Sequence, residues 1–159
     1  MVNERLVINT GPLILLSKAE ALDAIGLLPY DFLCPRAVRN ELDSGVVKGY
    51  PAVAPSWLTV HSISEPISPF SSITLDSGES EVIQLALELK IRTVCLDELK
   101  GRRVARALGL RVTGALGLLG RAKKTGIIPA LQPYIKKLLA AGAWYSQELL
   151  DDFIAEFGE

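Results

Sequence analysis

Two polar residues stand directly after short apolar runs of the kind that form buried strands. Asn9 follows Leu6-Val7-Ile8, and Asp97 follows Val94-Cys95-Leu96. If both runs belong to one parallel sheet, both side chains lie beyond the carboxyl ends of strands, where such sheets bind ligands. Carboxylate and carbonyl oxygens are the ligands that Mg²⁺ or Mn²⁺ prefers. An ion of this kind can hold a phosphodiester and activate a water molecule, so the pair points to phosphoryl chemistry.

Two glutamates on predicted helices can join this pair. Glu81 lies in the first turn of one helix, and Glu41 lies near the end of another. Asp76 and Glu79 have the spacing of a capping box, which gives Glu79 a local duty that Glu81 lacks. Glu79 is nevertheless a rival for the place of Glu81. Surface charge is the favoured explanation of Glu41, because Arg39 and Asp43 lie near it.

Each strand-end residue also has a local explanation. An asparagine after a strand is often a turn former whose side chain bonds the nearby backbone. Asp97 can cap the helix that follows it, and Thr10 suits the N-cap of the helix after Asn9. These local roles are compatible with membership of a site.

The charge distribution hints at an anionic partner. Residues 99–147 carry ten Lys or Arg and no Asp or Glu, whereas residues 148–159 carry five acidic and no basic residues. Arg102, Arg103 and Arg106 lie on one predicted helix, where they can hold nucleic-acid phosphates. The same run can bind an acidic partner segment, or the acidic tail of a second copy. Solvated helix faces account for it about as well.

Alternating strands and helices are expected to position these residues. Strands are predicted over residues 6–8, 32–34, 57–60, 93–96 and 111–113, and helices over 11–19, 21–28, 35–42, 77–90, 98–108, 115–124, 131–140 and 147–157. The Ser- and Pro-rich stretch 62–74 is the segment expected to be most flexible. The alternation predicts an α/β domain with a mainly parallel sheet that helices cover on both faces.

The bulk composition is that of one globular domain. The chain has 159 residues, of which 49% are apolar and 22% charged, an ordinary balance for a folded protein. No signal peptide and no apolar run of the ~20 residues needed to span a membrane is present. Cys34 and Cys95 lie in apolar runs and are expected to be free buried thiols, as in a reducing compartment. These features predict a cytoplasmic protein. The glycine-rich signatures of nucleotide-binding folds are absent after the first strand.

Three motifs follow one another along the chain. They are Val7-Ile8-Asn9-Thr10-Gly11-Pro12-Leu13-Ile14, Gly78-Glu79-Ser80-Glu81-Val82-Ile83-Gln84-Leu85-Ala86 and Val94-Cys95-Leu96-Asp97-Glu98. In this order they resemble the PIN-domain family. The stretch from Ala107 to Pro129 is similar to a VapC-like branch, whose members are often the toxin of a bacterial toxin–antitoxin pair. Each motif alone is weak, but their order on the expected elements is fairly specific.

The resemblance implies a three-layer α/β sandwich with C-terminal helices, here residues 1–125 with a helical extension over 126–159. Active members of the family are metal-dependent ribonucleases. The family's catalytic acids then fall on Asn9, Glu41, Glu81 and Asp97. The resemblance places Mg²⁺ or Mn²⁺ on Asp97, Glu81 and Asn9 and makes Thr10 a candidate contact to RNA. The basic run adds Arg102, Arg103 and Arg106 as further candidate contacts to RNA.

Asn9 is the departure from the family pattern, which has aspartate at that position. Asparagine offers a neutral carbonyl oxygen, so the site loses one negative charge and should bind a cation more weakly. The expected partners are RNA, a cognate antitoxin protein and further copies of the chain, as a homodimer or higher homo-oligomer. The alternative is a non-catalytic PIN-like module that binds RNA or a protein through its basic face.

Overall fold

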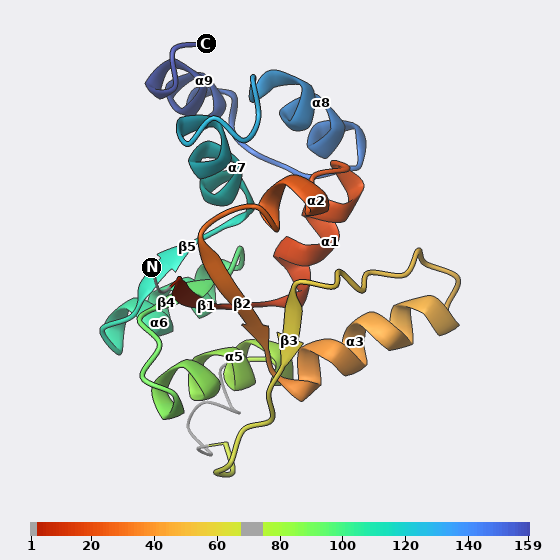
Figure 1. Cartoon of the computed structure of the whole chain (residues 1–159), viewed down its shortest axis with the longest axis vertical. Helices are drawn as coiled ribbons and strands as arrows, with labels where there is room; N and C mark the ends of the chain where they lie inside the picture. Colours follow the sequence, from red (N-terminus) through yellow and green to blue (C-terminus); the bar gives the residue numbers. More distant parts are fainter. Residues whose placement is uncertain (1–2, 68–74) are drawn as a thin grey trace.

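The centre of the molecule is one parallel sheet (Figure 1). The computed structural model describes residues 3–67 and 75–159. Its strands are β1 (Glu4–Ile8), β2 (Tyr30–Cys34), β3 (Leu58–Val60), β4 (Thr93–Cys95) and β5 (Arg111–Thr113). They lie in the order β3-β2-β1-β4-β5, and every neighbouring pair is parallel. The predicted mainly parallel sheet is confirmed.

Helices cover both faces of this sheet. The helices of the described residues are α1 (Thr10–Lys18), α2 (Leu22–Ile25), α3 (Arg36–Val47), α5 (Ser77–Glu88), α6 (Leu99–Ala107), α7 (Ala115–Lys124), α8 (Gln132–Ala140) and α9 (Gln147–Glu156). α5 and α6 pack together on one side, and α1, α2 and α7 pack together on the other (Figure 1). This arrangement confirms the predicted three-layer sandwich. No helix among the described residues is long and apolar enough to cross a membrane.

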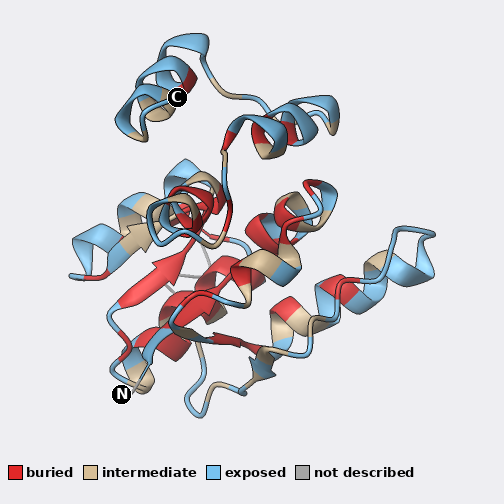
Figure 2. Ribbon diagram, turned by 45° about the horizontal axis from the view of Figure 1, so that its top comes forward, coloured by how far each residue is buried: buried red, intermediate tan, exposed pale blue. Residues whose placement is uncertain are grey.

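The two central strands form the buried middle of the core (Figure 2). Leu6, Val7 and Ile8 of β1 are fully buried, as are Val94 and Cys95 of β4. Strands covered on both faces read as continuous apolar runs, which is why the sequence revealed them. Because close packing leaves these strands little freedom, residues at their carboxyl ends have fixed positions. Both cysteines are buried and free, as expected.

α3 is longer than the predicted helix over 35–42. It continues to Val47 and ends in a Schellman motif, in which Gly49 N donates to Val46 O and Tyr50 N donates to Gly45 O. Gly49 supplies the left-handed conformation that this motif needs, with φ of 93°. Gly45, which lies beyond the predicted end of the helix, is therefore inside it.

The predicted flexible stretch over 62–74 falls partly outside the described residues, which omit 68–74. Its first part is anchored, because the backbone N–H groups of Ser64 and Glu65 each donate to the Glu88 carboxylate at 2.8 Å. A hydrogen bond from Gln84 and the bond from Ser64 lower the pKa of Glu88 to about 2. Residues 64–65 are therefore fastened to the end of α5.

A glycine permits the close approach of an aromatic ring to α2. A Cβ on Gly26 would lie 2.3 Å from Cδ1 of Trp57, whose ring packs 4.8 Å from that of Phe32. Gly26→Ala must therefore displace a large ring, and we expect it to lower the free energy of unfolding by about 1–3 kcal/mol. Chemical denaturation measures this change. Gly45→Ala is the matched control, since its nearest neighbour lies at 3.8 Å. Equal stability of the two variants would contradict the prediction.

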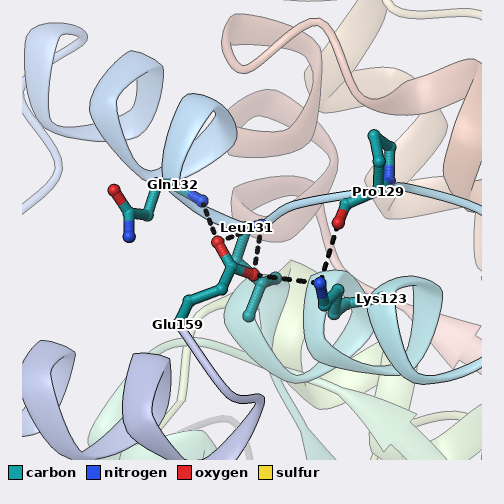
Figure 3. Close-up of polar contacts among 5 residues, drawn as sticks. All are labelled: Lys123, Pro129, Leu131, Gln132 and Glu159. Atoms are coloured by element: carbon teal, nitrogen blue, oxygen red, sulfur yellow. Dashed lines mark hydrogen bonds and ion pairs between the residues drawn. The ribbon is translucent and has the colours of Figure 1, made fainter.

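Glu159 fastens the C-terminal helices to one another (Figure 3). Its carboxylate accepts hydrogen bonds from Leu131 N at 2.8 and 3.0 Å and from Gln132 N at 3.3 Å, at the start of α8. It also lies 3.6 Å from Lys123 Nζ on α7, and that ammonium donates to Pro129 O. A carboxylate at a helix N-terminus stabilises the helix dipole, so Glu159 links α7 and α8 to the segment after α9.

This contact predicts a pH-dependent contribution to stability. Burial acts to raise the pKa of Glu159, but the bonds from Leu131 and Gln132 and the charge of Lys123 outweigh it and lower the pKa below 4.5. A folded-state pKa below the unfolded value gives stability that is present above the unfolded pKa and is lost as pH falls through the folded pKa. Glu159→Gln should therefore have a lower Tm than the parent at pH 7, and the difference should shrink as pH falls below 4.5. Glu156→Gln, an exposed neighbour, is the control. A difference that persists unchanged in acid would exclude this role.

Candidate functional site

The candidate residues lie at the point where the strand order reverses. β1 and β4 are neighbours, with Ile8 opposite Cys95, while β2 and β3 lie on one side of β1 and β5 on the far side of β4. Asn9 N continues the pairing by donating to Cys95 O at 3.1 Å. Asn9 and Asp97 therefore lie just past the carboxyl ends of adjacent strands, at the switch point where open parallel sheets bind ligands.

Asn9 and Thr10 carry buried oxygens without hydrogen-bond partners. Asn9 occupies the N-cap position of α1, but its side chain makes no capping bond. Thr10 is the first residue of α1, so its predicted role as N-cap is wrong. The Asn9 side chain is 7% exposed, and Asn9 Oδ1 and Thr10 Oγ1 are both buried and unpaired. Such groups cost about 1–3 kcal/mol each when unsatisfied, and the turn-forming explanation of Asn9 provides no compensating bond.

Asp97 is held by the first turn of α7. Its Oδ1 accepts from Ala115 N at 3.0 Å, whereas the N-cap of α6 is Glu98, so the alternative role of Asp97 as a cap of the following helix is wrong. Its Oδ2 is buried and unpaired. Burial raises the pKa of this carboxyl, although the bond from Ala115 and the charge of Arg102 oppose the rise. Burial thus disfavours the ionised form of Asp97 more than its hydrogen bond and the nearby arginine favour it.

Glu41 and Glu81 approach from the other side of α1. Glu41 Oε1 and Asn9 Oδ1 lie 2.6 and 3.1 Å from the position that a Cβ would take on Gly78, so both converge on the first turn of α5. Glu81 Oε1 accepts from Ala37 N at 3.3 Å, in the first turn of α3. Glu81 thus has a structural role at the start of α3, which the sequence did not reveal because its partner is distant in the chain.

The candidate acids line two clefts that flank α1. Thr10, Glu41 and Glu81 line the cleft against α3, which we call the α3 cleft. Asp97 and Arg102 line a second cleft bounded by α7 and α9, which we call the α9 cleft. Among residues 3–67 and 75–159, no three His, Cys, Asp or Glu side chains are placed to share a metal ion. Asp97 and Glu81 could therefore bind one metal ion only together with neutral ligands, such as the side-chain oxygens of Asn9 and Thr10 or water molecules.

Glu79 has surroundings that its local sequence did not reveal. Asp76 Oδ1 accepts from Glu79 N at 2.8 Å, which confirms the predicted cap of α5. The Glu79 carboxyl, however, packs against Gly101 of α6, and Glu79 is only 5% exposed. Burial, followed by the charges of Asp76, Glu98 and Glu41, raises its pKa to about 7. Its position depends on how α5 and α6 pack, so Glu79 remains a rival of Glu81 as the helix acid.

The three arginines of α6 are placed differently. Arg102 Nη1 donates to Leu96 O at 2.8 Å, and that nitrogen and Asp97 Oδ1 both lie within 3 Å of the position that a Cβ would take on Gly114. Arg102 therefore supports the strand end and the acid. Arg103 and Arg106 are exposed on the helix and line neither cleft. Contacts of these two arginines with RNA stay a prediction.

The donor atoms fit a hard divalent cation. Asn9 Oδ1, Thr10 Oγ1 and Asp97 Oδ2 are all oxygens, all buried and all without partners, which is the type of donor that Mg²⁺ and Mn²⁺ prefer. A cation beside Asp97 would oppose the effect of burial, because a positive charge lowers the pKa that burial raises. The site thus matches such an ion in donor chemistry, with fewer anionic ligands than four acids would supply.

Comparisons with known proteins identify the family. No curated protein matches the chain. A PilT N-terminus domain protein from the hyperthermophilic archaeon Sulfolobus solfataricus P2 is similar in structure, with a TM-score of 0.47 and 18% identity, over 74% of this chain and 92% of that chain. The family model DUF3368, described as PIN domain, matches residues 5–159. Because that match spans nearly the whole chain, the protein belongs to the PIN domain family.

Proposed function

We propose that the chain is a metal-dependent endoribonuclease of the PIN type and the toxin of a toxin–antitoxin pair. Membership of the PIN family supports a nuclease-type function. The observation that carries the proposal is the set of unpaired buried oxygens of Asn9, Thr10 and Asp97 at the ends of two central strands. The similarity of residues 107–129 to the toxin branch supports the biological role.

Asp97, Asn9 and Glu81 are the residues that would hold Mg²⁺ or Mn²⁺. When bound, the ion would lower the pKa of an attacking water and offset charge on the scissile phosphate. Ala115 N fixes the orientation of Asp97, and the strand pairing to Cys95 fixes the backbone of Asn9. Fixed donors need no rearrangement during the reaction, which favours the transition state.

Thr10 and Glu41 have supporting roles in the proposed site. The Thr10 hydroxyl is unpaired and can donate to a phosphate oxygen. Glu41 is exposed near the start of α5, where it can accept a proton from water or from a ribose hydroxyl. Both residues line the α3 cleft, so the substrate is expected to enter there.

Cleavage of a labelled single-stranded RNA by the purified chain tests this function. We expect cleavage in Mg²⁺ or Mn²⁺ that EDTA abolishes. Expression in a bacterial host should arrest growth, and co-expression of the gene product encoded next to it should relieve the arrest. Absence of cleavage with both metals would contradict the enzymatic proposal, and cleavage without growth arrest would contradict the toxin role.

A non-catalytic RNA- or protein-binding module is the second candidate. It is favoured by Asn9, which contributes only a carbonyl dipole where the family has an acid. Titration with Mg²⁺ by calorimetry separates the two. Saturable binding that Asp97→Ala abolishes supports the enzyme, whereas RNA binding without any metal binding supports the module.

A further inference from the structure

An exposed aromatic residue stands at the rim of the α3 cleft. Tyr50 follows the end of α3 and is 66% exposed. Its backbone is fixed, because Tyr50 N donates to Gly45 O at 2.9 Å and completes the Schellman motif. A residue at this position usually packs against the helix residue five positions earlier. That residue is Gly45, which has no side chain, so the backbone is anchored while the ring stays largely open to solvent.

A second, mostly apolar recess adjoins the same ring. It is bounded by Ile14, Leu42, Pro51 and Val53, and it shares Tyr50 with the α3 cleft. The loop that forms its wall is fastened to α3, because Arg39 Nη2 donates to Val53 O at 2.9 Å. Tyr50 therefore lies between a polar cleft that contains candidate acids and an apolar hollow with fixed walls.

Positive charges flank this pair of hollows. Arg36 and Lys48 line the α3 cleft beside its two glutamates, and Lys18 lines the apolar recess, at which Glu41 also stands. An apolar hollow beside a tyrosine ring suits the flat face of a base, and cations along a cleft suit the phosphates on either side of it. An unpaired nucleotide satisfies both demands, whereas a base inside a duplex presents no free face.

The α9 cleft also has an exposed aromatic residue, but acidic side chains outnumber basic ones in its lining, whereas the two are balanced in the α3 cleft. Trp144 is 84% exposed and shares that cleft with Glu148, Asp152 and Glu156. These acids repel a phosphate backbone. Charge therefore favours Tyr50 over Trp144 as the residue that meets a nucleic acid.

We propose that Tyr50 and the recess beside it bind one unpaired base of single-stranded RNA, with the adjoining phosphates on Lys48 and Arg36. This inference rests on the proposed function and extends it, because it places one nucleotide of the substrate next to the candidate acids. Stacking on an aromatic ring tolerates every base, so the subsite should contribute affinity and register more than sequence choice.

The test is fluorescence anisotropy of a labelled single-stranded RNA with the full chain in EDTA, where cleavage is absent. Tyr50→Ala should weaken binding about 5- to 20-fold, since loss of one stacked base costs at the lower end of the usual range when the ring is half open. Tyr50→Phe should bind within about twofold of the parent. Trp144→Ala, the matched exposed aromatic, should bind like the parent. Unfolding curves check that the variants fold.

Abasic RNA and duplex RNA sharpen the result. One abasic position should weaken binding to the parent but not to Tyr50→Ala, because the two changes remove the same contact. Duplex RNA should bind both proteins equally. Parent-like binding by Tyr50→Ala, a loss confined to Trp144→Ala, or no RNA binding at all would overturn the inference. Tyr50-dependent binding without cleavage in Mg²⁺ or Mn²⁺ would refute the catalytic proposal and leave the base subsite standing, whereas cleavage that ignores Tyr50 would do the reverse.

Discussion

Asp97→Asn is expected to lower the rate of RNA cleavage by at least about 100-fold, because disturbing even an outer partner of a metal ligand costs about 10- to 100-fold. The substitution removes the only carboxylate that has a buried, unpaired oxygen among the described residues. Asparagine keeps an Oδ1 atom that can accept from Ala115 N, so the start of α7 stays anchored. The substitution therefore removes the charge at position 97 while it keeps the hydrogen bond that anchors α7. Single-turnover cleavage in saturating Mg²⁺ or Mn²⁺ measures it.

Stability gives this experiment a second readout. Burial raises the pKa of Asp97, which means that its ionised form is disfavoured in the metal-free fold. Asp97→Asn should therefore unfold at the same temperature as the parent or above it in EDTA, and it should lose any stabilisation that Mg²⁺ gives the parent. A variant with low activity and a much lower Tm would indicate a structural role in place of a metal-binding one.

Glu98→Gln is the matched control for this substitution. Glu98 is the next residue, it is exposed, and it occupies the N-cap position of α6 without a side-chain capping bond. Loss of its charge should leave cleavage near the level of the parent. Equal losses in the two variants would show that a general change of potential, and not a ligand at position 97, governs the rate.

The elements that carry the site were largely predictable because their signals are local. The helix over Ala115–Lys124 and the strand over Arg111–Thr113 have the predicted bounds. The buried parts of β1 and β4, residues 6–8 and 94–95, are continuous apolar runs, as strands covered on both faces must be. Asn9 and Asp97 could be located as strand ends for this reason, since parallel strands of one sheet share a carboxyl edge.

The side-chain contacts between elements were not predictable, because they join residues that are distant in the sequence. Glu79 had a sufficient local explanation as part of a capping box, yet its carboxyl lies against Gly101, 22 positions later. The sequence suggested that Asp97 caps the helix directly after it, but its carboxylate accepts a hydrogen bond from Ala115 N, at the start of the next helix. Tyr50 carried no sequence signal, since its position follows from where α3 ends. Local pattern thus predicts elements, whereas packing decides which side chains meet.

Asn9→Asp should have opposite effects on stability without and with metal. Asn9 Oδ1 is buried near Glu41 Oε1, so an aspartate there adds a poorly hydrated charge next to another acid. An unpaired buried group costs about 1–3 kcal/mol or more when charged, and about 1 kcal/mol shifts the Tm of a chain of this size by roughly 2–4 °C. We expect the Tm in EDTA to fall by about 2–10 °C.

Divalent metal should reverse this loss in the Asn9→Asp variant. Ion affinity rises with the number of anionic ligands, so Mg²⁺ or Mn²⁺ should bind the variant on the order of tenfold more tightly than the parent and raise its Tm by more. Calorimetric titration and thermal unfolding across metal concentrations measure the two effects. Cleavage should rise together with affinity if the neutral residue is what weakens the site.

Asn40→Asp controls for charge alone, because Asn40 is exposed and lines the α3 cleft, to which Thr10, the neighbour of Asn9, also belongs. An exposed substitution of this kind should change stability by no more than about 0.5 kcal/mol and leave metal affinity near that of the parent. If both variants gain affinity equally, the cleft attracts cations through its general potential. If Asn9→Asp gains none, the end of β1 is not a ligand position. A gain confined to Asn9→Asp would show that the strand ends still hold the geometry of a metal site, and that the charge at position 9 sets its affinity.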